Sequence, residues 1–267
     1  MDFKDILFSV EDGIATITLN RPKTLNAINL ELIEEWRTAI EMARDDPGIK
    51  VLVVTGSGRA FSSGADPKLL MALRSRTNPP PLTDRHAMKT QTMLSIARTA
   101  ATLDKPYIGA INGAAVGGGM DLASLCDIRI ASDKAKFGMA FVRMGEIPTG
   151  GGCYFLPRII GVARACELIW TGKLIGAEEA LSIGYVTKVV PLDELMDTVR
   201  ELALKLSRGP SVAISLTKKL IYRCLDLDMN TALEAHLISQ TVAESTQDAV
   251  EGPKAWLEKR EPIFKGK

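Results

Sequence analysis

The spacing of hydrophobic positions changes along the first 56 residues. ILFSV and IATITL alternate hydrophobic and polar residues on either side of EDG, which predicts a β-hairpin. Hydrophobic residues then recur at helical spacing from about Leu30 to Ala43, and Asn29 is suited to cap such a helix. KVLVVTG is almost wholly apolar, which is typical of a strand covered on both faces. The order is therefore strand, strand, helix, strand.

Strands and helices continue to alternate up to about residue 200. YIGAI and DIRIAS predict further strands with a helix between them, and TKVV predicts another after the helical stretch AEEALSIG. This order favours a layered α/β fold. From about Leu192 the pattern predicts successive helices, so we expect a core of residues 1–200 and an all-helical region of residues 201–267. Ser75 to Asp84, with three consecutive prolines, is either a surface connection or a loop at a pocket mouth.

The composition is that of a globular protein, with 46% hydrophobic and 24% charged residues. A formal net charge of +1 gives no reason to expect nucleic acid or a membrane surface as a partner, although a local basic patch remains compatible with it. No apolar run reaches the roughly 18 residues that a membrane span needs, and we expect a cytoplasmic protein. The four cysteines have no CxxC spacing and there are only two histidines, so no metal site is predicted.

Two glycine-bearing turns, each between a strand and a helix, are the candidate site. The first is RAFSSGADPKLL, in which Asp66 followed by proline marks a helix start. The second is INGAAVGGGMDLASLCD, whose three consecutive glycines leave backbone N–H groups unshielded at a helix entrance. Two interpretations are open. Either the glycines let a helix pack tightly on a strand, or the N–H groups of Ser63 and Gly118 point at one oxygen, helped by the helix dipole.

The same segments carry a family resemblance. FSSGAD, INGAAVGGGMDLASLCDIRIAS and KFGMAFVRMGEIPTGGGCYFLPRIIG match, in order and spacing, the signature of the crotonase (enoyl-CoA hydratase/isomerase) family. WTGKLIGAEEALSIGYVTKVVP and the ending EGPKAWLEKREPIFKG are similar to that family as well, so the resemblance covers essentially the whole chain. It implies a spiral of repeated ββα units with a C-terminal helical region used in assembly. It also implies a homo-trimer or hexamer and an acyl-coenzyme A thioester as substrate, with no separate cofactor.

The resemblance also implies roles for individual residues. It makes the N–H groups of Ser63 and Gly118 an oxyanion hole, which would stabilise the enolate of a thioester. The residues that it places around the substrate are Asn26, Ala27 and Ile28, near the adenine end, and Ser63, Gly64, Ala65, Asp66, Gly117, Gly118 and Phe141.

Acid and base groups fit the family less closely. Family hydratases carry two glutamates, of which the first corresponds to Asp121 and the second to Phe141, which has no proton to give. Asp121 can still move a proton if its surroundings raise its pKa towards neutrality, or it is simply an acid that complements the helix dipole. Glu146, five residues after Phe141, is either the substitute catalytic carboxylate or a surface glutamate.

These residues leave three functions open. The first is an enoyl-CoA hydratase or isomerase in which Asp121 moves a proton while two N–H groups hold the enolate oxygen. The second keeps the thioester but changes the reaction to C–C bond cleavage, decarboxylation or thioester hydrolysis, because the second glutamate is missing. The third is a catalytically silent acyl-CoA binder or assembly subunit.

Overall fold

The N-terminal hairpin and the first helix form as the sequence predicts. The structure, a computed structural model, describes residues 3–74 and 92–267, and the predicted proline loop lies outside the described residues. β1 (Ile6–Glu11) pairs antiparallel with β2 (Ile14–Leu19) through a turn at Asp12 and Gly13, both with positive φ, as a two-residue hairpin turn requires. α1 (Leu30–Asp45) begins after Asn29, whose side chain accepts the N–H of Leu32 at 2.8 Å.

The strands form two sheets, and from β3 to β8 successive strands belong alternately to one sheet and the other. The six-stranded sheet has the order β1-β2-β3-β5-β7-β10, with β3 (Val51–Gly56), β5 (Tyr107–Ile111), β7 (Ile128–Ser132) and β10 (Lys188–Val190). The four-stranded sheet has the order β4-β6-β8-β9, with β4 (Ala60–Ser62), β6 (Ala114–Val116), β8 (Lys136–Gly138) and β9 (Ile175–Gly176).

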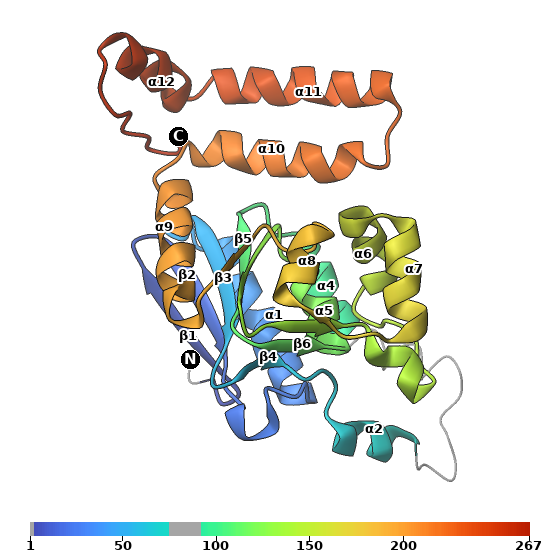
Figure 1. The fold of residues 1–267 in the computed structure, drawn as a ribbon. Helices are drawn as coiled ribbons and strands as arrows, with labels where there is room; N and C mark the ends of the chain where they lie inside the picture. The colour runs from blue at the N-terminus through green and yellow to red at the C-terminus, as the bar shows by residue number, and fades with distance from the viewer. Residues whose placement is uncertain (1–2, 75–91) are drawn as a thin grey trace.

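Each of β3, β5 and β7 is followed by a short strand of the second sheet and then by a helix. The helices are α2 (Pro67–Arg74) after β4, α5 (Gly118–Ala123) after β6, and α6 (Gly152–Ile160) after β8 and the 3-10 turn η2 (Ala140–Met144). The repeated unit winds the chain into a spiral (Figure 1). The α/β fold of repeated ββα units is therefore confirmed.

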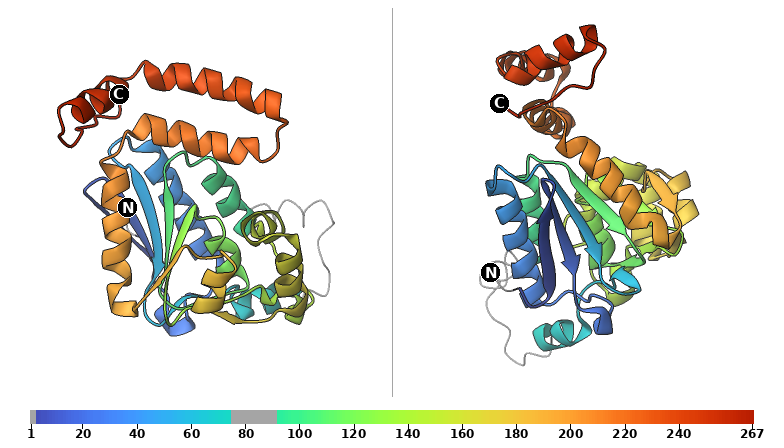
Figure 2. Two further views of the ribbon diagram at one scale, coloured as in Figure 1. Left: turned by 45° about the horizontal axis from the view of Figure 1, so that its top comes forward. Right: turned by 90° about the vertical axis from the view of Figure 1, so that its left-hand side faces the viewer.

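The large sheet is covered on both faces. On one face α1 and α4 (Met93–Ala101) build the main core, in which the Trp36 indole N–H donates to the Tyr107 hydroxyl at 2.9 Å. On the other face α9 (Leu195–Ser207) packs Leu195, Val199 and Ala203 against the sheet (Figure 2). β3 is buried along its whole length, as its continuous apolar run predicts.

α9 crosses the boundary expected at residue 200. Because this helix belongs to the packing of the sheet, the core extends to Ser207, and we place the proposed division of the chain after that residue. α10 (Ser211–Cys224) and α11 (Met229–Glu244) then run side by side over one end of the core, followed by α12 (Gln247–Leu257) (Figure 1). Asp127 anchors α10 by accepting from the Lys218 ammonium at 2.8 Å and the Tyr222 hydroxyl at 2.7 Å.

The second sheet and two helices were not predicted. β4, β6, β8 and β9 have only two or three residues each, which is too short for a strand period to show in the sequence. α6 and α7 (Val162–Thr171) lie where no helix was expected from the hydrophobic pattern, and α8 (Ala177–Ser182) matches an expected helix. In the part of the chain that the structure describes, no helix combines the length and apolar character that crossing a membrane requires.

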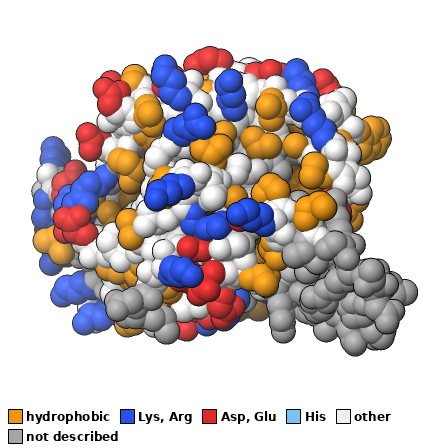
Figure 3. Space-filling model, turned by 90° about the horizontal axis from the view of Figure 1, so that it is seen from below, with side chains coloured by type: hydrophobic (Ala, Val, Ile, Leu, Met, Phe, Trp, Pro, Cys, Tyr) orange, Lys and Arg blue, Asp and Glu red, His pale blue; other side chains and the backbone are white. Residues whose placement is uncertain are grey.

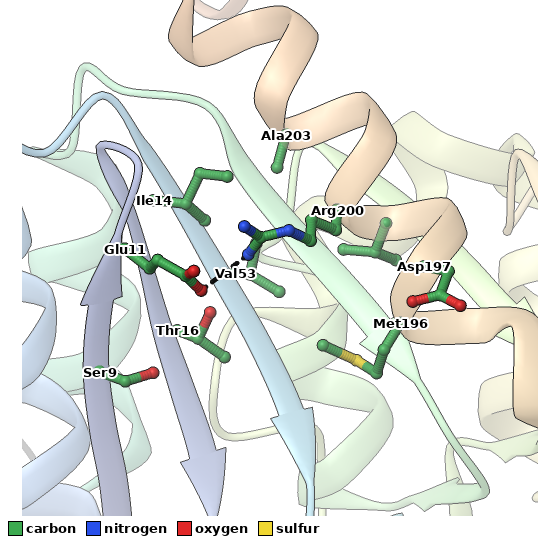
Figure 4. Close-up of a pocket in the computed structure, with 10 residues that line it drawn as sticks. Ser9, Glu11, Ile14, Thr16, Val53, Met196, Asp197, Arg200 and Ala203 are labelled. Carbon is green, nitrogen blue, oxygen red and sulfur yellow. Dashed lines mark hydrogen bonds and ion pairs between the residues drawn. The ribbon is translucent and has the colours of Figure 1, made fainter.

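A cavity of about 150 Å³ lies between α9 and the hairpin strands (Figure 4). Arg200 crosses its rim to form ion pairs with Glu11 at 2.8 Å and Asp12 at 2.7 Å. Its floor is made by Ile14 and Val53 of the sheet. None of the residues that line it belongs to the predicted site, so the site must be built elsewhere.

Candidate active site

The two glycine-bearing turns lie against each other. β4 and β6 are parallel neighbours, so the turn after β4 and the entrance of α5 leave the small sheet at the same edge. A Cβ atom on Gly64 would lie 3.0 Å from the Gly118 nitrogen and 2.6 Å from the Val116 oxygen. A Cβ on Gly119 would lie 2.2 Å from the Ser62 oxygen. Tight packing therefore explains Gly64 and Gly119, the first of the two interpretations of these glycines.

The N–H of Gly118 is directed away from α5. It is the first helical residue, and its N–H has no hydrogen-bond partner among the described residues. The Gly117 carbonyl accepts from the Asp121 N–H at 3.0 Å. Because that carbonyl and the Gly118 N–H belong to one peptide plane and point in opposite directions, this bond fixes where the free N–H points. α5 has only six residues, so this oriented N–H matters more than the expected helix dipole.

The prediction that the Ser63 N–H is a free oxyanion donor is wrong. That N–H donates to the Leu25 carbonyl at 2.9 Å, and the Ser63 hydroxyl contacts the Thr24 carbonyl at 3.3 Å. The turn at residues 24 and 25 thus occupies the donor that the site was expected to use. Ser63 therefore holds two loops together.

Ala65 presents an unpaired N–H instead. The Ile28 N–H donates to the Gly64 carbonyl at 2.8 Å, and the Asp66 N–H donates to the Ile28 carbonyl at 2.9 Å. In such a parallel bridge the residue between the two bonds turns its own N–H to the opposite side. Gly64, with φ of 91°, makes the turn between Ser63 and Ala65. No group in residues 3–74 or 92–267 accepts the Ala65 N–H.

Every backbone N–H group of the Asn26 to Ile28 segment already has a hydrogen-bond acceptor within the protein. The N–H groups of Asn26, Ala27 and Ile28 donate to the carbonyls of Arg21, Thr24 and Gly64, at 2.9, 3.2 and 2.8 Å. A ligand can therefore form hydrogen bonds with the backbone of this segment only through its carbonyl oxygens, each of which has a second lone pair.

Asp66 confirms the predicted helix start. One carboxylate oxygen accepts from the Lys68 N–H at 3.0 Å, which caps α2, and the other lies 3.3 Å from the Arg21 guanidinium. Proline occupies the first position of α2, as expected. Asp66 thus ties the first turn to the neighbouring loop.

Asp121 is a completely buried carboxyl group. Its Oδ2 accepts from the Gly150 N–H at 2.5 Å, while its Oδ1 has no hydrogen-bond partner in residues 3–74 or 92–267. Burial raises its pKa to about 6, against the lowering effect of the N–H groups of Gly150, Gly152 and Thr149 that face it. A carboxyl group in this state can both give and accept a proton near neutral pH, unlike an exposed acid that only complements a dipole.

Hydrophobic side chains surround the entrance of α5. A Cβ on Gly118 would meet the Met93 sulfur at 2.7 Å and the Ile28 side chain at 3.1 Å. Phe141, on η2, is only 9% exposed and belongs to the main core. Glu146 is half-buried, and its N–H donates to the Phe141 carbonyl at 3.0 Å.

The family model described as enoyl-CoA hydratase/isomerase matches residues 9–267. The chain belongs to this family. It is thus an enzyme of the enoyl-CoA hydratase/isomerase family, whose substrates are acyl-CoA thioesters.

Relatives within the family differ in reaction. The chain is 34% identical over 269 residues to a crotonyl-CoA hydratase of Syntrophomonas wolfei, with 99% of each chain covered. It is 38% identical over 264 residues to a 1,2-epoxyphenylacetyl-CoA isomerase of Escherichia coli, with 98% of each chain covered. A crystal structure of an enoyl-CoA hydratase from Bacillus anthracis superimposes with a TM-score of 0.91 at 34% identity, covering 99% of this chain and 100% of that one.

Two features of this family member escaped the sequence analysis. Ala65 was named as a lining residue but not as a donor, because a free N–H leaves no mark on residue type. Gly150 and Gly152, which enclose the Asp121 carboxyl group, sit in a glycine run that was quoted only as part of the family signature.

Replacing Asn26 by alanine should destabilise the fold by about 2 to 4 kcal/mol. Its buried side chain accepts from the Arg21 N–H at 2.9 Å and donates to Ser57 and Ala60 carbonyls at 3.0 and 2.8 Å, and its φ is positive. Urea unfolding measures the loss. Asn29→Ala, which removes a helix cap, is the control and should cost about 1 kcal/mol; equal losses for the two variants would contradict this account.

Replacing Asp121 by asparagine should change how stability depends on pH. The folded pKa of about 6 lies above the ordinary 3.8, so the carboxyl group imposes no cost below pH 3.8 and an increasing cost as pH rises through 6. Above pH 7 the ionised group costs up to about 3 kcal/mol, and the stability of Asp121→Asn relative to the parent should rise by that amount between pH 4 and 8.

Asp226→Asn is the control for that titration. The Arg158 guanidinium and the Tyr154 hydroxyl hold the pKa of the exposed Asp226 below its usual value, so its stabilising effect is present above that value and is lost in acid. This variant should therefore show a small trend of opposite sign in denaturant melts at the same pH values. A pH-independent difference for Asp121→Asn would disprove the burial argument.

Proposed function

We propose that the protein transfers a proton to and from the carbon chain of an acyl-CoA ester, with Asp121 as the catalytic acid and base. The N–H groups of Ala65 and Gly118 would hold the thioester oxygen as it gains charge. The observation that carries the proposal is the close packing of Gly64 on the entrance of α5, where an added Cβ would lie 3.0 Å from the Gly118 nitrogen. This packing brings together two N–H groups that have no partner among the described residues, one helical turn from a buried carboxyl group of raised pKa.

A single carboxyl group favours isomerisation over hydration. Adding water to a double bond calls for one group to activate the water and another to move the second proton, and Phe141 stands where the resemblance places the second glutamate. Moving a double bond needs no water. The Asp121 carboxylate removes a proton from C2 of a 3-enoyl thioester, the electrons enter the dienolate oxygen, and the now neutral Asp121 returns the same proton to C4. Glu146 stays a candidate second carboxylate for the hydration alternative.

The coenzyme A part would lie along the 3-10 turn Pro22–Thr24, which carries Lys23, and the first turn of α2, which carries Lys68. These exposed lysines flank the Asn26 to Ile28 segment and the first glycine turn. The face seen from below in Figure 1 carries Lys and Arg side chains next to hydrophobic ones, with Asp and Glu side chains among them (Figure 3).

We further propose a homo-trimer or hexamer in the cytoplasm. Leu233, Leu237 and Ile238 on α11 are 55%, 65% and 70% exposed, which leaves an apolar surface for a second copy to cover. The four cysteines are free thiols, which is compatible with a reducing compartment.

Asp121→Asn should reduce the isomerisation of a short 3-enoyl-CoA by about a thousandfold, because the variant cannot accept the C2 proton. Affinity for the ester, measured by calorimetry, should stay within about threefold of the parent. Chromatographic separation of the 2-enoyl and 3-enoyl isomers measures isomerisation, and mass spectrometry in deuterated buffer measures exchange of the C2 protons. Glu146→Gln is the matched control and should retain activity within about fivefold.

Other outcomes separate the alternatives. Fast water addition to a trans-2-enoyl-CoA that requires both Asp121 and Glu146 would favour hydration. Turnover of β-keto, malonyl or cyclic esters in place of the 3-enoyl ester would favour C–C cleavage, decarboxylation or hydrolysis. Binding with neither isomerisation nor exchange of C2 protons would leave a silent acyl-CoA binder.

A further inference from the structure

The short helix α5 needs external support. It has six residues, too few to be stable by its own hydrogen bonds, yet it carries both the Gly118 N–H and the Asp121 carboxyl group. Its N-terminal side is held where the Gly117 N–H donates to the Gly138 carbonyl at 2.7 Å. Its C-terminal half must be held by something else.

The Met120 carbonyl is that second point of attachment. It accepts from the Tyr185 hydroxyl at 3.1 Å and from the Ser124 hydroxyl at 2.8 Å, and the two hydroxyls lie 3.1 Å apart. The Met120 carbonyl and the Asp121 N–H share a peptide plane, so fixing the oxygen also fixes the N–H on its opposite side.

The two peptide planes form a chain of hydrogen bonds. Tyr185 holds the Met120 oxygen, and the N–H of the same plane, that of Asp121, donates to the Gly117 oxygen at 3.0 Å. The Gly117 oxygen belongs to the same peptide plane as the Gly118 N–H, which is the proposed oxyanion donor. Bonds in such a series polarise one another, so the first one influences both the direction and the strength of the last donor.

Tyr185 itself is held rigidly. It is fully buried, 65 residues from Met120 in sequence, with the edge of its ring packed against Phe137 at a centroid distance of 5.0 Å. The Arg129 guanidinium lies 5.2 Å from the ring centroid, and its Nε donates to the Tyr185 carbonyl at 2.6 Å. A second nitrogen of Arg129 donates to the Cys126 carbonyl, just beyond α5. The hydroxyl therefore has a fixed place relative to α5.

We propose that Tyr185 is a positioning residue, whose hydroxyl orients the Gly118 N–H and the backbone of Asp121 through the Met120 carbonyl. Its effect on catalysis rests on the proposed function. Its effect on the backbone does not, because the hydrogen bonds exist without substrate.

Tyr185→Phe removes the hydroxyl and keeps the ring. We expect kcat for the 3-enoyl ester to fall about five- to tenfold with KM within about twofold, since an oriented donor acts on the transition state more than on substrate binding. We also expect amide hydrogen exchange in a peptide covering residues 117–126, read by mass spectrometry, to become about fivefold faster.

Tyr107→Phe is the matched control. Tyr107 is also fully buried, and its hydroxyl bonds to the Trp36 indole N–H, away from α5. This variant should lose stability but leave kcat and the exchange of residues 117–126 unchanged. Equal falls in kcat for both variants, or unchanged exchange in Tyr185→Phe, would overturn the proposal.

Asp121→Asn separates the two hypotheses. Loss of turnover in that variant with a fully active Tyr185→Phe would leave the proposed function in place and remove the role of Tyr185. Turnover unaffected in Asp121→Asn, with faster exchange in Tyr185→Phe, would reject the proposed function and retain the backbone positioning.

Discussion

The close approach of Gly64 to the Gly118 nitrogen is the contact on which the rest of the site depends. It requires β4 and β6 to be parallel neighbours, which in turn requires each repeated unit to give one strand to each sheet. It also requires glycine at both turns, because a Cβ on Gly64 or Gly119 would meet backbone atoms at 3.0 Å or less. Both the spiral fold and the glycines in the turns are thus needed to bring the Gly64 turn close to the Gly118 nitrogen.

The polar part of the site is mostly main chain, and this limits what a sequence can reveal. The motif FSSGAD located the right turn, but the positive φ of Gly64 decides which N–H faces inward, and no side chain reports it. The Ser63 N–H donates to the Leu25 carbonyl, whereas the Ala65 N–H, two residues later, has no acceptor among the described residues. Tyr185 is equally hidden, since its partner Met120 lies 65 residues away and offers only a carbonyl.

The fold was more predictable where elements are long. β3 was predicted from its continuous apolar run, and the helices after residue 192 were predicted from their periodic apolar positions. Asn29 marked the start of α1. The short strands of the second sheet gave no such signal, because they are defined by neighbours rather than by their own sequence. The boundary expected at residue 200 stays a prediction, and our proposal to place it after Ser207 depends on packing: the sequence of α9 resembles that of the helices that follow, and only its contact with the sheet groups it with the core.

Asp121 and the glycines around it are best understood as a matched set. A Cβ on Gly152 would lie 2.3 Å from Oδ1 of Asp121, and one on Gly150 would lie 3.0 Å from Oδ2. The backbone of these two glycines therefore packs closely around the carboxyl group, and no side chain fits between them. Burial in this enclosure raises the pKa of Asp121 to about 6, the range in which one group can act as base and then as acid.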